Sequence, residues 1–142
     1  MKRRIFYLFL CSPIILAAQN NPHSIDPRLY DVYDNTYIDD LAKSYPLMID
    51  RWNFYLDEAY FITDSPKEKE IHGDYPTIKI ADFKNINILK LEKEQGLSHD
   101  WDKMTTYKIE GSNKHLVYFP GKIFIEKLKQ HFIENRNLVN KR

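Results

Sequence analysis

The chain has 142 residues, of which 43% are hydrophobic, 14% aromatic and 29% charged, and its formal net charge is +1 at neutral pH. This composition is typical of a folded globule and excludes a disordered chain. The charges nearly balance, and one basic helix at the C-terminal end is weak support for a nucleic-acid surface, so we expect no nucleic-acid binding.

The N-terminus has a cationic and then an apolar segment. Residues 2–4 are basic, residues 5–16 are mostly apolar, and two alanines end the segment at Ala18. A charged head, an apolar core and small residues before a cut are the layout of a secretory signal peptide. We predict cleavage after Ala18. Cleavage one residue earlier is the alternative, because Leu16 is larger than the small residue usually found at its position before the cut. The layout resembles a Sec-type leader and predicts export to the periplasm or cell surface of a Gram-negative bacterium.

Two other interpretations of the leader are open. A membrane anchor needs about 20 apolar residues, which is longer than the run over 5–16, so we expect no transmembrane segment in the mature chain. A lipoprotein would use the only cysteine, Cys11, but Leu10 stands where a small residue is required. Removal of residues 1–18 would also remove this cysteine, which excludes disulfides and thiol chemistry from the mature chain.

The mature chain, residues 19–142, has the length of one domain. Loss of the three leader cations changes its formal charge from +1 to −2. Acidic side chains dominate residues 19–82 and basic ones dominate residues 122–142. A solvated charged helix accounts for the basic end, so the predicted domain is dipolar rather than basic.

Helical signals dominate the first half of the domain. Apolar side chains recur at helical spacing, and Asp26 before Pro27 is a typical start, with an acidic cap and proline in the first turn. The elements predicted here are a helix over 25–44 that the pair Asn35-Thr36 allows to be divided, a helix over 46–55 and a strand over 60–63. A hairpin that pairs residues 52–55 with 60–63 is the alternative.

From residue 77 onward, apolar and polar residues tend to alternate, which is typical of strands. The elements predicted here are strands over 77–83, 87–93, 104–110 and 115–119, with a turn at 111–113, and a closing helix over 122–136. Strands that follow one another without helices between them favour antiparallel pairing. The expected fold is therefore α+β, with N-terminal helices, an antiparallel β-meander of about four to five strands, and a C-terminal helix packed on the sheet.

The sequence contains no phosphate-binding loop, zinc-protease motif or nucleophile elbow. The candidate catalytic residues are His99, Asp100 and Asp102 on one predicted loop, which His72 and Asp74 could join. Imidazole and carboxylate groups serve as acids, bases and ligands of divalent metals. The alternative is a polar turn in which Asp100 caps the loop and a neighbouring tryptophan packs on the sheet. We predict no metal and no cofactor.

Tyrosines crowd the acidic half of the domain. Tyr30, Tyr33 and Tyr37 lie on the first predicted helix, where aspartates are also frequent. Tyrosine is large, stiff and amphipathic, which suits recognition surfaces. These three residues are therefore the candidate partner-binding surface, and burial in the core is the alternative.

Three functions fit these observations. The first is a non-enzymatic interaction or accessory protein of the bacterial envelope whose partner is another envelope protein. The second is a small carbohydrate-binding module that uses exposed tyrosine or tryptophan, and the third is a small secreted hydrolase that uses the loop around His99.

Overall fold

The computed structural model of the protein describes residues 24–64 and 75–139. The predicted leader and the candidates His72 and Asp74 lie outside these residues. In the part of the chain that is described, no helix is both long enough and apolar enough to cross a membrane.

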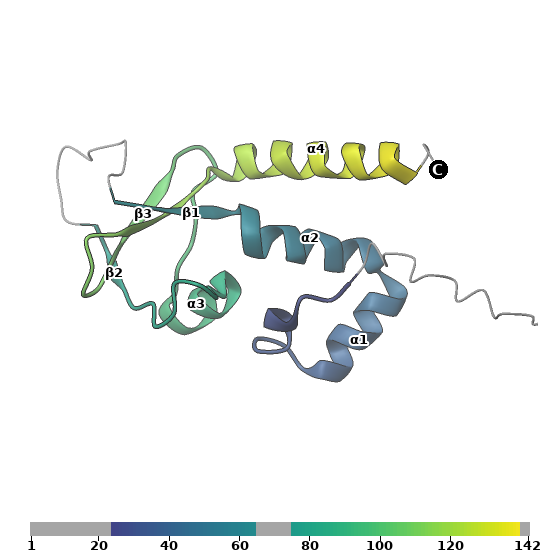
Figure 1. Ribbon diagram of the computed structural model, residues 1–142, viewed down its shortest axis with the longest axis horizontal. Coiled ribbons are helices and arrows are strands. Elements are labelled where there is room, and N and C mark those ends of the chain that lie inside the picture. The colour runs from purple at the N-terminus through teal and green to yellow at the C-terminus, as the bar shows by residue number, and fades with distance from the viewer. Residues whose placement is uncertain (1–23, 65–74, 140–142) are drawn as a thin grey trace, which may run out of the picture.

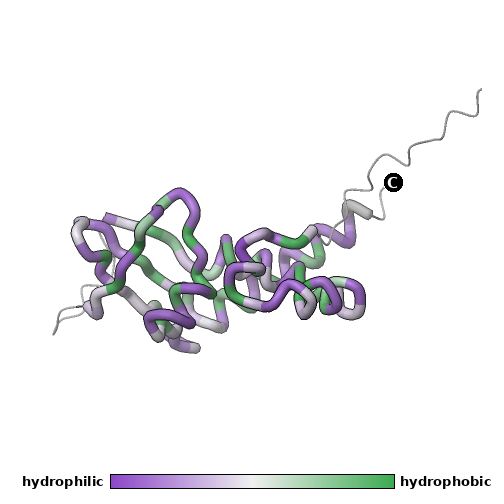
Figure 2. Tube along the Cα trace, turned by 90° about the horizontal axis from the view of Figure 1, so that it is seen from below, coloured by the Kyte–Doolittle hydropathy of each residue, from purple (hydrophilic) through white to green (hydrophobic). Residues whose placement is uncertain are grey.

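The fold is α+β, as expected. Its elements are a 3₁₀ turn η1 (Pro27–Leu29), helices α1 (Asn35–Ser44) and α2 (Pro46–Glu58), strands β1 (Tyr60–Thr63) and β2 (Thr77–Ile78), helix α3 (Ile88–Gln95), strands β3 (Thr105–Ile109) and β4 (His115–Tyr118), and helix α4 (Gly121–Val139). The sheet occupies one end of an elongated molecule, and α2 and α4 run side by side away from it (Figure 1). Hydrophobic and hydrophilic stretches are interspersed along the helical end of the molecule (Figure 2), as in helices that bury one face.

The prediction of an antiparallel meander is wrong. The described sheet has four strands in the order β1-β4-β3-β2, and it is mixed. Strand β4 pairs antiparallel with both β1 and β3, whereas β2 runs parallel to β3. A parallel pair needs a crossover connection, and α3 supplies it between β2 and β3.

The predicted strand over 87–93 is the source of this error, because these residues form α3. The side chain of Asn87 accepts a hydrogen bond from the backbone N–H of Lys90 at 3.1 Å and so caps the start of the helix. Gly96 ends it with a φ of 67°, a conformation that glycine adopts without steric cost. Two cap residues thus decide between helix and strand where apolar spacing does not.

The predicted strand over 77–83 is shorter than expected, with only Thr77–Ile78 paired in the sheet. Directly after it, the side-chain amide of Gln95 bonds both the N–H and the C=O of Lys79, each at 2.8 Å. A side chain of α3 therefore replaces the neighbouring strand at this edge.

The other elements agree closely with the prediction. Asp34 caps α1 through the N–H groups of Thr36 and Tyr37, which divides the helix predicted over 25–44. Pro46 begins α2, and Gly111, with a φ of 73°, lies in the turn between β3 and β4.

The closing helix packs along α2 rather than across the sheet (Figure 1). Phe124 and Leu128 of α4 are buried against Ala59 and against aromatic side chains such as Phe54 and Tyr55 of α2. The main core is formed by η1, α1, α2 and α3 together with the sheet. Leu56, Ile109 and Tyr118 are fully buried in it.

Candidate functional site

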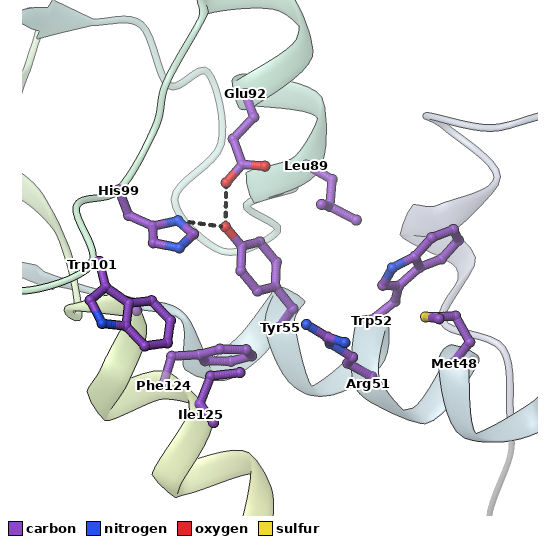
Figure 3. A pocket seen from close by; sticks show the side chains of 11 residues that line it. Met48, Arg51, Trp52, Tyr55, Leu89, Glu92, His99, Trp101, Phe124 and Ile125 are labelled. Atoms are coloured by element: carbon purple, nitrogen blue, oxygen red, sulfur yellow. Dashed lines mark hydrogen bonds between the residues drawn. The ribbon is translucent and has the colours of Figure 1, made fainter.

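A pocket of about 410 Å³ opens between α2, α3, the first turn of α4 and the loop that precedes β3 (Figure 3). Its aromatic lining consists of Trp52, Tyr55, Trp101 and Phe124. Trp101 and Phe124 lie on one side of the pocket and Trp52 on the other, with Tyr55 between them (Figure 3). The chain has two tryptophans, and both line this pocket.

Helix α2 supplies one wall. Met48, Trp52 and Tyr55 follow one another at helical spacing and therefore share one face, which points into the pocket. Arg51, one position before Trp52, lines the same wall and is exposed. It forms no hydrogen bond or ion pair with any part of the chain that the structure describes.

A hydrogen-bonded cluster forms the base of the pocket. Tyr55 Oη donates to Glu92 Oε1 at 2.6 Å, and Tyr118 Oη donates to the same oxygen at 2.9 Å. Tyr55 Oη also lies 3.2 Å from Nδ1 of His99. Because Tyr55 gives its single proton to Glu92, Nδ1 of His99 is the donor in this contact. Helices α2 and α3, strand β4 and the loop of His99 meet in this cluster.

Both tyrosines of the cluster are held in the protonated form. Burial raises the pKa of Tyr55 above its ordinary value, and the hydrogen bond to Glu92 adds to this effect. Burial also raises the pKa of Tyr118, again with the Glu92 carboxylate as the second cause. The two hydroxyls are therefore fixed donors that hold one carboxylate in place.

The two aspartates predicted beside His99 do not line this pocket. Asp100 Oδ1 accepts from the backbone N–H groups of Asp102 at 2.7 Å and Lys103 at 2.9 Å, and these bonds lower the pKa of Asp100. Asp102 forms an ion pair with Lys122 at 3.1 Å. Asp100 thus has the loop-capping role that was the alternative prediction, and His99 is the one of the three candidates in the pocket.

A second hollow, of about 430 Å³, borders the same loop. Its lining includes His99, Asp100 and Lys103 and few apolar side chains. The described residues of its lining include no aromatic side chain other than His99, so the first pocket, with its aromatic walls, is the stronger candidate for a binding site.

The loop is tied to the start of α4. Backbone N–H groups of Gly121 and Lys122 donate to the carbonyl oxygens of Asp100 at 2.9 Å and Trp101 at 3.2 Å. A Cβ atom on Gly121 would lie 2.7 Å from Cε3 of Trp101, so the indole needs a glycine at this position. Trp101 therefore packs at the start of α4 rather than on the sheet, with 60% of its surface exposed at the mouth of the pocket.

Of the three candidate partner-binding tyrosines, Tyr33 and Tyr37 are linked to the pocket through Trp52, whereas Tyr30 bonds Asp39. Tyr30 Oη donates to Asp39 at 2.8 Å, which raises the pKa of Tyr30. Tyr33 stacks on Trp52 with ring centroids 4.8 Å apart, and Tyr37 lies 6.2 Å beyond Tyr33. Tyr37 is 51% exposed, whereas Tyr33 is half-buried and supports the pocket wall.

Sequence reasoning missed Glu92, Arg51 and Tyr118. Glu92 was assigned to a strand, and its partners come from α2 and β4, far away in the sequence.

Among the described residues, no three His, Cys, Asp or Glu side chains are placed to hold a metal ion together.

Comparison with known proteins assigns no family. Neither the protein-family models, nor the curated proteins, nor the solved structures yield a match for this chain. What the pocket binds is therefore inferred from its own residues.

Proposed function

We propose that the protein is an exported, non-enzymatic recognition protein of the bacterial envelope, and that it binds its ligand or partner in the aromatic pocket. The observation that carries this proposal is the base of the pocket, where Glu92 is held by Tyr55 and Tyr118 beneath open aromatic walls. Apolar walls with a few fixed polar groups are the usual composition of a binding site.

The polar groups favour binding over catalysis. The lining of the aromatic pocket includes no serine, threonine or cysteine that His99 could activate as a nucleophile. The raised pKa values of Tyr55 and Tyr118 make their hydroxyls poor bases and poor nucleophiles. These groups fix one another in position, which suits recognition.

The exported location rests on the leader. Its basic head, its apolar run over 5–16 and the two alanines that end at Ala18 are the supporting observations. Fractionation of cells that express the tagged chain tests this part of the proposal. Recovery of the full-length precursor in the cytoplasm alone would contradict it.

Tryptophan fluorescence tests binding directly, because both tryptophans line the pocket. The mature protein is titrated separately with periplasmic proteins, detergent-extracted outer-membrane proteins and soluble cell-wall glycans. We expect one fraction to change the emission saturably, with no consumption of the bound component. Trp52→Phe and Trp101→Phe should each remove part of the response.

A matched control is Phe83→Ala, since Phe83 is 42% exposed but does not line the pocket. This variant should respond like the unmodified protein. A lack of response to all fractions would contradict the proposal. Consumption of the bound component that His99→Ala abolishes would make the protein an enzyme instead.

A further inference from the structure

Three polar groups in the pocket have unused bonding capacity. Glu92 binds both tyrosines through Oε1, which leaves Oε2 as an acceptor. His99 makes its contact through Nδ1, which leaves Nε2. The guanidinium of Arg51 has no partner among the described residues. The pocket therefore offers a cationic donor, an anionic acceptor and an imidazole nitrogen.

This mixture of charges distinguishes between ligand classes. An anionic ligand would meet the carboxylate of Glu92, and a cationic ligand would meet Arg51. An apolar side chain would bury these groups without partners, at a cost of about 1–3 kcal/mol for each. A hydroxyl group both donates and accepts, so a neutral ligand with several hydroxyls satisfies all three groups.

The aromatic side chains supply the second requirement. Trp101 presents 60% of its surface at the mouth, while its loop is tied to α4 by backbone hydrogen bonds. The indole is therefore a positioned, solvent-facing platform. The C–H face of a pyranose ring is apolar and packs on such a surface, while its hydroxyls point outward toward polar groups.

We infer that the ligand of the pocket is a neutral saccharide whose ring stacks on Trp101 and whose hydroxyls bind Arg51, Glu92 and His99. This inference rests on the proposed recognition function and names its ligand class. The volume of about 410 Å³ lies in the lower part of the range for small-molecule sites, which suits a mono- or disaccharide.

Calorimetric titration with a defined sugar panel tests this inference. The panel contains glucose, galactose, mannose and N-acetylglucosamine, with a disaccharide of each. The control compound is tetrahydropyran-2-methanol, which has the ring but lacks the ring hydroxyls. We expect at least one sugar to bind and the control compound to show no binding.

Two variants separate the hydrogen bonds from the stacking. Arg51→Gln should weaken sugar binding about tenfold, which is the loss expected for one charged hydrogen bond. Trp101→Ala should abolish detectable binding. Both side chains are exposed, so unfolding transitions should be unchanged. Arg136→Gln, at an exposed position near the far end of α4, is the matched control and should bind normally.

The outcomes distinguish this inference from the proposed function. If no sugar binds but an envelope protein fraction changes the tryptophan emission, recognition stands and the saccharide assignment is wrong. If neither binds, both are wrong. If a sugar binds and is cleaved, the ligand class stands and the non-enzymatic function is wrong. Equal binding of tetrahydropyran-2-methanol would overturn the role of the hydroxyls.

Discussion

The hydroxyl of Tyr118 donates a 2.9 Å hydrogen bond to Oε1 of Glu92 and so joins the sheet to α3. Tyr118 is fully buried, and the same oxygen also accepts from Tyr55 on α2. A single carboxylate therefore fixes two helices and a strand around the pocket. Both the stability of the fold and the binding of a ligand should therefore depend on Glu92.

Replacement of Glu92 by alanine should be strongly destabilising, because the donors of Tyr55 and Tyr118 lose their acceptor. Each unpaired buried donor costs about 1–3 kcal/mol, so we expect the free energy of unfolding in urea to fall by about 2–4 kcal/mol. Glu92→Gln keeps an acceptor and should lose less than half of that.

The control for this prediction is Glu94→Ala on the same helix. Glu94 is exposed and pairs with Lys90 on the surface at 4.0 Å, so its loss should cost less than about 0.5 kcal/mol. Similar losses in the Glu92 and Glu94 variants would show that the cluster does not stabilise the fold.

The protein should lose stability in alkali through its buried tyrosines. The pKa values of Tyr55 and Tyr118 are raised in the folded state by burial, so folding favours their neutral forms. This stability is present below the ordinary pKa of about 10 and is lost as pH rises above it. Tyr118→Phe should reduce the slope of unfolding free energy against pH by up to about 1.4 kcal/mol per pH unit. An unchanged slope would show that Tyr118 ionises normally in the folded protein.

Acid should weaken the contact between η1 and the rest of the fold. Arg28 bonds Asp26 at 2.7 Å, Asp57 at 2.5 Å and the carbonyl of Ile86 at 3.0 Å. The hydrogen bond from Arg28 lowers the pKa of Asp26. The stabilisation of the fold by this ion pair is therefore present above about pH 4 and is lost as pH falls further.

Asp26→Asn should therefore flatten the decline of unfolding free energy on acidification, as measured by urea denaturation at several pH values. Asp40→Asn is the control, because its pair with Lys43 is exposed and 3.7 Å long. That variant should change stability at neutral pH by less than about 0.5 kcal/mol. Parallel pH curves for Asp26→Asn and the unmodified protein would contradict the role of Asp26.

Gly121→Ala should displace Trp101 more than it affects stability. The added Cβ would lie 2.7 Å from Cε3 of the indole, and the exposed ring can move aside. We expect a shifted tryptophan emission and weaker ligand binding, with a small change in the unfolding transition.

Gly96→Ala is the contrasting variant. Nothing lies within 4 Å of a Cβ at this site, but the φ of 67° is unfavourable for alanine. It should cost about 1 kcal/mol of unfolding free energy and leave the tryptophan emission unchanged. If the two variants gave the same spectral change, the contact between Gly121 and Trp101 would not position the indole.

Local sequence signals were sufficient for part of the fold. Pro46 at the start of α2 and the turn at Gly111 depend on neighbouring residues alone, and both were predicted correctly. The spacing of Ile88, Leu89 and Leu91 fits a helix as well as a strand, so this segment was assigned wrongly. The parallel pairing of β2 was missed for the same reason, because it follows from the crossover through α3.

The candidate site was predicted only where one residue carried its own chemical signal. His99 was chosen because an imidazole and two carboxylates on one loop are a recognisable constellation. Glu92 has a role only because Tyr55 and Tyr118 arrive from α2 and β4, which no local pattern indicates. Asp100 and Asp102 were predicted to share one loop, yet the direction of their side chains is set by backbone N–H groups and by Lys122.

The place of β1 in the sheet has a consequence for how the chain folds. Its partner is β4, and the paired residues Tyr60 and Tyr118 lie far apart in the sequence. Strands β3 and β4, in contrast, pair locally as a hairpin. During synthesis from the N-terminus, α1, α2 and β1 are made before β4, the strand that pairs with β1. Loop closure over this distance is slow relative to local pairing, so the hairpin should form first and recruit the N-terminal half late. Until β1 and β4 pair, Ile49 and Leu56 of α2, which are fully buried in the folded protein, should remain exposed to water.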